Sequence, residues 1–141
     1  MTVIAKRKEG LDWLYGIIGM ICLFLFIIML ITDSEPILAI FLLILGVAST
    51  YLFITHKKTP KDMISVDEST GEIYLHIDKL SISVTDVVDI SYDKARARGI
   101  QYEWGTLIIE TGIEKFEYQY VADVESVSKE LTRIMYLHKN K

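Results

Sequence analysis

Two stretches decide the fold: WLYGIIGMICLFLFIIMLIT (residues 13–32) and PILAIFLLILGVASTYLFIT (residues 36–55). Each is 20 residues long, and neither contains a charged side chain. At roughly 1.5 Å per residue a helix of this length measures about 30 Å, the thickness of the hydrocarbon core of a bilayer. Because backbone amides in lipid must be hydrogen-bonded internally, each stretch is predicted to be helical. Together they predict a two-helix transmembrane hairpin at residues 13–55.

A cleaved signal peptide is the rival interpretation of the first stretch, because Lys6-Arg7-Lys8 precedes it. The apolar run is longer than the roughly 7–15 residues of a signal core, and no small-x-small cleavage site follows it. A second apolar run follows directly instead. These features favour two membrane spans.

The short flanks of the spans predict their orientation. Lys6, Arg7 and Lys8 precede the first span, Lys57, Lys58 and Lys61 follow the second, and the connection Asp33-Ser34-Glu35 carries only acids. Positively charged flanks remain in the cytoplasm. We therefore expect a multi-pass protein of the cell membrane with both termini in the cytoplasm.

Small residues predict where the two spans pack. Antiparallel helices bring the start of the first span beside the end of the second, and small side chains allow close backbone approach in lipid. The residues expected at this crossing are Gly16, Gly19, Gly46, Ser49 and Thr50, with an intermolecular dimer face as the alternative. Cys22 is expected to be a packing residue, with palmitoylation as its alternative. Since neither span contains an ionisable Asp, Glu, Lys, Arg or His, we expect an anchor and no transport pathway.

The rest of the chain has the composition of one small acidic domain. Residues 56–141 hold 12 Lys and Arg against 15 Asp and Glu, a net charge of −3. Phosphate contacts depend on Lys and Arg, so nucleic acid is not expected as a partner. The same balance disfavours attachment of the whole domain to anionic lipid by charge.

After the second span the hydrophobic period changes from helical to two, which predicts short antiparallel strands. Gly71 is expected in a turn with positive φ, and a terminal helix with Asp123 as N-cap begins near Val124. We expect an α+β domain, an antiparallel curved sheet or small barrel capped by the C-terminal helix. The predicted segments are an N-terminal cytoplasmic segment (1–12), the hairpin (13–55), a linker (56–62) and the domain (63–141). The expected strands are 64–66, 73–77, 80–84, 87–92, 100–104, 106–111 and 115–121.

The closing half of the chain resembles bacterial PH-like domains. In these domains a G-T-L-x-I-x-T strand, here residues 105–111, pairs with a Tyr/Lys-rich strand, here 115–121, and leads through a V-x-D-x-E-x-V segment, here 121–127, into the last helix. Residues 86–90 resemble the family's earlier I-x-D-I-x-x-I strand less closely. The resemblance covers roughly residues 63–137 and implies a PH-like fold.

The whole arrangement, a two-span hairpin followed by such a domain, resembles small membrane proteins of Gram-positive bacteria. Some of these are linked to self-immunity against bacteriocins, especially leaderless ones. The resemblance implies a bacterial plasma-membrane protein without enzymatic activity, whose partners are the lipid bilayer and either a bacteriocin peptide or another membrane protein. A membrane-anchored scaffold that recruits a protein or lipid is the alternative function.

Acidic and imidazole side chains do not form a recognisable reactive set. Asp86, Asp89 and Asp93 lack the spacing and central glycine of an EF-hand, so solvated charges are expected. The three histidines are scattered along the sequence without partners at metal-ligand spacing: His56, His76 and His138. We therefore expect no metal, no cofactor and no catalytic residue.

One short segment concentrates positive charge in this acidic domain. Lys94, Arg96 and Arg98 alternate with small residues, so an extended backbone would aim all three the same way. Tyr102 and Trp104, also two apart, follow them. These five residues are the predicted contact for lipid headgroups or an acidic partner, and a solvated strand or loop is the alternative.

A second aromatic set occurs near the end of the sheet. Phe116, Tyr118 and Tyr120 would share one face of a regular strand. Core or cross-strand packing is the expected role, with a peptide groove against the terminal helix as the alternative.

Overall fold

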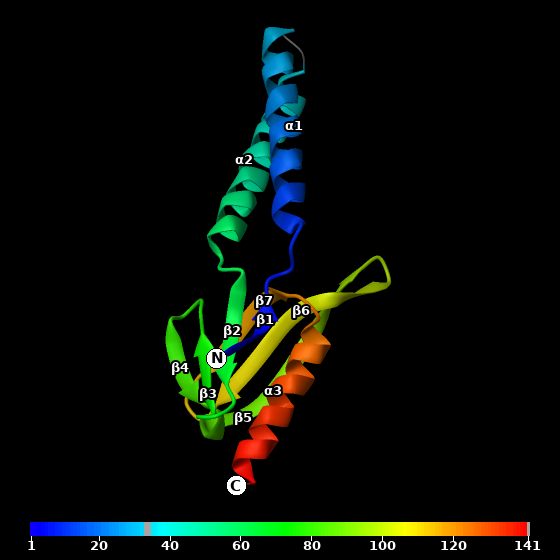
Figure 1. Ribbon diagram of the computed structural model, residues 1–141. Coiled ribbons are helices and arrows are strands. Elements are labelled where there is room, and N and C mark those ends of the chain that lie inside the picture. The colour runs from blue at the N-terminus through cyan, green and yellow to red at the C-terminus, as the bar shows by residue number, and fades with distance from the viewer. Residues whose placement is uncertain (33–34, 141) are drawn as a thin grey trace. The chain divides into compact units, whose positions relative to one another are not determined.

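The computed structural model describes residues 1–32 and 35–140 (Figure 1). The chain divides into two compact units. Met1–Lys8 and Pro60–Lys141 form one, called the sheet unit, and Glu9–Thr59 form the other, called the hairpin unit.

The hairpin unit consists of two helices, α1 (Leu11–Ile31) and α2 (Pro36–Lys58). Both are long and apolar enough to cross a membrane. Pro36 occupies the first helical turn of α2, where its missing N–H costs no hydrogen bond. Asp33 and Ser34 of the predicted connection lie outside the described residues.

Small residues of α1 and α2 face the other helix. A Cβ atom on Gly19 would lie 3.0 Å from Thr50 Oγ1, and one on Gly46 would lie 2.9 Å from the Leu23 side chain. The Thr50 hydroxyl donates to the Gly46 carbonyl at 2.8 Å, which satisfies it within its own helix. Of the residues expected at the crossing, Gly19 lies against Ser49 and Thr50, whereas Gly16 lies against Phe53 and Gly46 against Leu23.

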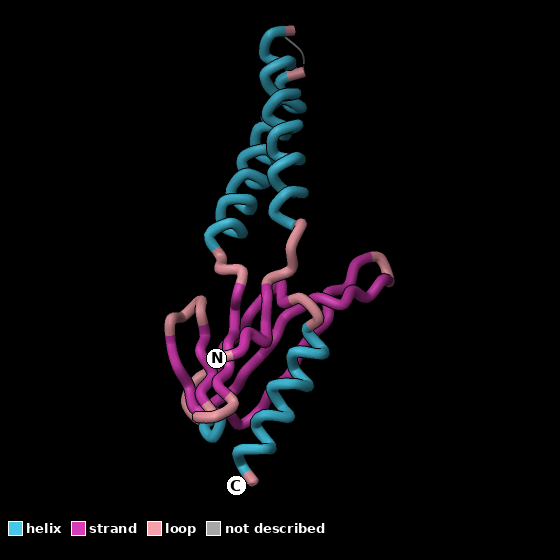
Figure 2. The backbone as a smooth tube through the Cα atoms, in the orientation of Figure 1, coloured by secondary structure: helices cyan, strands magenta, loops and turns pink. Residues whose placement is uncertain are grey.

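The sheet unit holds two antiparallel sheets and a C-terminal helix, and its sheets are not closed into a barrel in the described residues (Figure 2). The first sheet has the order β1 (Thr2–Lys6), β2 (Asp62–Asp67), β3 (Glu72–Leu75), β4 (Leu80–Ser83). The second has the order β5 (Val87–Ala97), β6 (Ile100–Thr111), β7 (Lys115–Val121). A short 3₁₀ turn, η1 (Val84–Asp86), joins the sheets, and α3 (Val124–Lys139) follows β7.

The first strand comes from the N-terminal segment, where the sequence did not predict one. β1 pairs with β2 from Thr2 opposite Val66 to Lys6 opposite Asp62, and the register shifts twice, between Val3 and Ala5 and between Ala5 and Lys6. Ala5 is fully buried in the core. The two helices are therefore the connection between two neighbouring strands of one sheet, and residues 1–8 belong to the sheet unit.

The core of the sheet unit lies between the two sheets and α3. Apolar side chains of β1, β2, β3, β6 and β7 are buried there together with Val87 at the start of β5, and α3 contributes one face. Gly71 has φ +71°, so the predicted positive-φ turn is confirmed. Asp123 stands at the N-cap of α3 with φ +47°, but its side chain makes no capping hydrogen bond. The buried residues of α3 are Val124, Val127, Ser128, Leu131, Ile134 and Met135.

Candidate functional site: the β5–β6 arm and its cleft

The distal parts of β5 and β6 form a two-stranded extension of the second sheet, residues 95–103, which we call the arm (Figure 2). Ala97 pairs with Ile100, so only Arg98 and Gly99 form the turn. Their φ values are +51° and +80°, the left-handed conformation that a tight two-residue hairpin requires. Arg98 is thus a turn residue and does not continue the strand that carries Lys94 and Arg96.

The register divides the arm into two faces. Arg96 is opposite Gln101 and Ala97 is opposite Ile100, and opposite residues point to the same side of a sheet. Because side chains alternate along β6, Ile100 and Tyr102 share the side of Ala97, whereas a register shift between Lys94 and Arg96 interrupts the pairing near Trp104. Near the tip, Arg96 and Tyr102 therefore point to different faces, whereas Arg96 and Trp104 both line the cleft at the base of the arm.

Lys94 is held by the terminal helix. Its ammonium forms an ion pair with the Glu125 carboxylate in the first turn of α3, and Lys129 Nζ lies 2.7 Å from the same carboxylate. Hydrogen bonds from Lys129 and Lys94 lower the pKa of Glu125 to about 2, and the pKa of each lysine is raised in return. Of the three predicted basic contacts, Arg96 and Arg98 remain as exposed cations, whereas Lys94 links β5 to α3.

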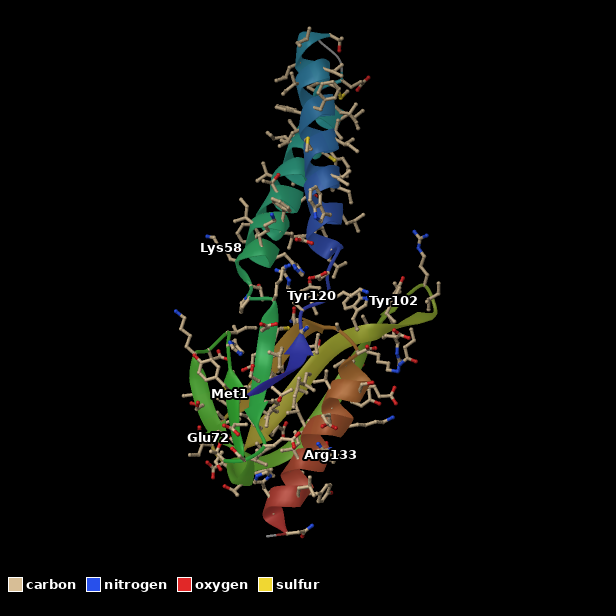
Figure 3. The ribbon with its side chains drawn as sticks, viewed as in Figure 1. Met1, Lys58, Glu72, Tyr102, Tyr120 and Arg133 are labelled. Atoms are coloured by element: carbon tan, nitrogen blue, oxygen red, sulfur yellow. The ribbon has the colours of Figure 1, made fainter. Side chains whose placement is uncertain are left out.

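Three rings form a continuous row at the base of the arm. The Tyr102 and Trp104 ring centroids are 5.8 Å apart, and Trp104 stacks on Tyr120 with centroids 5.7 Å apart and planes 25° apart. Figure 3 shows Tyr102 on the arm and Tyr120 at the end of β7. Such stacked rings form a rigid flat surface at small cost in conformational entropy.

A bulge in β7 separates the aromatic residues that a regular strand would keep on one face. Gly105 pairs with Val121 and Leu107 with Tyr118, so one extra residue lies in β7 between these pairs. Tyr120 has φ +61° and joins the ring row, whereas Tyr118 is buried and donates its hydroxyl to Asp78. Burial and this hydrogen bond raise the pKa of Tyr118. Phe116 packs against the core.

A cleft of about 590 Å³ opens at the base of the arm. It is lined by residues 93–96 of β5, 104–106 of β6 and 119–120 of β7. Lys94 and Arg96 supply cations, Trp104 and Tyr120 supply ring surface, and Asp93 supplies an acid. This combination suits a bound group that carries negative charge beside an apolar or planar part.

Replacement of Glu125 by glutamine is expected to weaken the acid dependence of stability. A carboxyl with a lowered pKa stabilises the fold above its unfolded pKa, near 4.5, and loses this contribution as pH falls towards 2. Urea unfolding between pH 5 and pH 2 should therefore show a smaller loss of stability for Glu125→Gln than for the parent. Glu72→Gln on β3, whose carboxylate has no ion pair in the described part of the chain, should follow the parent curve.

The other residues considered from the sequence are dispersed. His76 Nε2 lies 2.7 Å from Ser65 Oγ, His138 Nδ1 lies 3.1 Å from the Ile134 carbonyl, and the His56 ring is 6.1 Å from that of Tyr15. Among residues 1–32 and 35–140, no group of three His, Cys, Asp or Glu side chains could hold a metal ion. Cys22 is buried in α1.

The β1 strand and the register shifts in the β1–β2, β5–β6 and β6–β7 pairings were not predicted from the sequence. The signal for β1 is the short apolar run Val3-Ile4-Ala5, which directly precedes the basic triplet.

Comparison of the chain with protein-family models, with curated proteins and with solved structures finds no match.

Proposed function

We propose that this protein is a membrane-anchored binding module without enzymatic activity, and that its specific role is self-immunity against a membrane-active bacteriocin. One observation carries the anchoring: α1 and α2 connect two paired strands of one sheet. The Arg7 amide donates to the Lys61 carbonyl at 2.9 Å, so the chain leaves and re-enters the sheet unit at neighbouring points. Both ends of the hairpin are thereby fixed to one folded domain.

Exposed apolar side chains support the proposal that α1 and α2 span a bilayer. In the most hydrophobic window of each helix only 11% and 17% of the residues are buried. A core helix of a soluble domain would bury far more, because exposed apolar area costs about 25 cal/mol per Å² in water. Lipid removes this cost along the whole helix.

The pairing of β1 with β2 supports the proposed orientation. Two strands of one sheet must lie on the same side of the membrane, so a hairpin with two spans satisfies the pairing and a single span would break it. The basic flanks, residues 6–8 and Lys57, Lys58 and Lys61, favour the cytoplasm as that side, and the proposed membrane is a bacterial plasma membrane.

The arrangement of the sheet unit supports a PH-like assignment. A four-stranded antiparallel sheet is followed by a three-stranded one, and a C-terminal helix packs against both. This agrees with the sequence resemblance over roughly residues 63–137. The cations and rings that meet in the cleft can bind ligands by charge and stacking. The proposed activity is therefore binding.

The test is expression of the full chain in a sensitive Gram-positive host, followed by challenge with a panel of leaderless bacteriocins. We expect a higher inhibitory concentration for at least one peptide. Arg96→Gln combined with Trp104→Ala should remove most of the gain, because both side chains line the cleft. Arg133→Gln, on the exposed face of α3, is the matched charge control and should keep it. No gain in tolerance, with the protein present in the membrane fraction, would refute the immunity role.

A further inference from the structure

We propose that the tip of the arm, residues 98–102, inserts its apolar side into the interface of the bilayer that α1 and α2 span. This inference rests on the proposed anchoring. It assigns the arm a lipid partner and leaves the cleft at its base for another ligand. The ligand class is a phospholipid surface containing anionic headgroups.

The tip exposes apolar surface where a hairpin turn is normally polar. Ile100, directly after the turn, is 60% exposed, and Tyr102 on the same side is 38% exposed. No other side of the arm offers such surface, because Arg96, Gln101 and Glu103 alternate on the opposite face. A β-branched aliphatic residue beyond two aromatic rings is the composition of a segment that enters the lipid–water interface.

Contacts within the sheet unit bring the arm close to the point where the chain enters the hairpin. The Lys8 amide, the last of the sheet unit before α1, donates to the Tyr120 carbonyl at 2.7 Å. The Tyr120 ring stacks on Trp104, and Trp104 contacts Tyr102. Since Lys8 must lie at the membrane surface if α1 begins at Leu11, the row of rings leads from that surface into the arm.

The charges of the arm favour an anionic bilayer. Residues 95–103 carry Arg96 and Arg98 against one acid, Glu103, in an otherwise acidic sheet unit. Each arginine near an anionic surface is attracted to it, and its long side chain can place the guanidinium among headgroups while its stem stays with the rings. Binding through the arm is thus expected even though the net charge of the domain disfavours it.

Tryptophan fluorescence can test this inference in the full chain, because Trp13 and Trp104 are its two tryptophans. The tip reporter is Tyr102→Trp in a Trp13→Phe, Trp104→Phe background. The anchor reporter is Trp104→Phe, which leaves Trp13 at the start of α1. Each protein is reconstituted into vesicles of phosphatidylcholine and phosphatidylglycerol in equal parts, with and without bromine on the acyl chains. We expect blue-shifted emission and quenching by brominated lipid for both reporters.

A matched control is Ile113→Trp in the same background, since Ile113 is 94% exposed in the turn after β6, at the other end of that strand from the arm. It should be quenched by acrylamide and not by brominated lipid. Arg98→Gln, at a residue that does not line the cleft, or pure phosphatidylcholine should reduce quenching of the tip reporter. If Tyr102→Trp changes the urea midpoint, Ile100→Trp takes its place.

The outcomes separate this inference from the proposed function. Quenching of Trp13 without quenching of the tip overturns the insertion of the arm and leaves the anchoring intact. Absence of quenching for Trp13 overturns both. Equal quenching at 102 and 113 overturns a specific role of the arm, and a tip shielded from acrylamide but not quenched by lipid assigns it to a protein contact instead.

Discussion

Replacement of Gly105 by alanine is expected to unfold the sheet unit. A Cβ atom at this position would lie 2.0 Å from the Asp93 carbonyl oxygen and 2.8 Å from the Lys94 Cα. Both are backbone atoms of β5, so no side-chain rotation can relieve the clash. The strands would have to separate at the Lys94–Gly105 pair, where the core sheet meets the arm. We expect a loss of more than about 4 kcal/mol, in the range of exceptional single substitutions.

The measurement is urea unfolding of the full chain in mild detergent, followed by Trp104 emission in a Trp13→Phe background. Gly112→Ala is the matched control, because a Cβ there would meet nothing within 4 Å. It should change stability by less than about 0.5 kcal/mol. A Gly105→Ala protein with the parent's midpoint and an intact Trp104 environment would show that β5 and β6 do not approach each other this closely.

The two helices could be predicted because their signal is local and strong. The apolar runs at 13–32 and 36–55 differ from α1 and α2 by only a few terminal residues. The length and apolarity of each segment predict a membrane-spanning helix without any contact to distant residues. The sequence therefore contains the necessary information. The period of α3 is likewise visible, since its buried residues recur at three- and four-residue steps.

β1 could not be predicted because its stability comes from a distant partner. Thr2–Lys6 is short, and its basic end looks like the flank of a membrane span. Only pairing with β2, across the whole hairpin, makes it a strand. The same segment therefore carries both the basic residues that predict orientation in the membrane and the short apolar run that forms β1. The basic residues make the strand hard to recognise from the sequence.

The arm shows where the two-residue alternation of a strand fails to predict the direction of side chains. Lys94, Arg96 and Arg98 would point the same way only on a regular strand, but the pairing shifts after Lys94 and the turn takes Arg98. Bulges depend on how strands meet in three dimensions, and a single sequence does not display them. The strands expected at 100–104 and 106–111 form one strand, β6, and Gly105 lies within it, where β5 passes too close for a side chain.

Replacement of Leu131 by alanine is the second change with a large expected effect. Leu131 is 1% exposed and belongs to the apolar face with which α3 closes the core. Removal of the isobutyl group loses its transfer free energy and leaves a cavity between α3 and the sheets, so we expect a loss of about 2–5 kcal/mol. Leucine and alanine are both strong helix formers, so the loss would reflect packing and not helix propensity.

Leu137→Ala tests this attribution on the same helix, because Leu137 is 49% exposed. It should shift the urea midpoint only slightly, whereas Leu131→Ala should lower it without changing the slope. Equal shifts of the urea midpoint for the two leucine substitutions would mean that α3 does not close the core. The base of the arm would then be held by the strands alone.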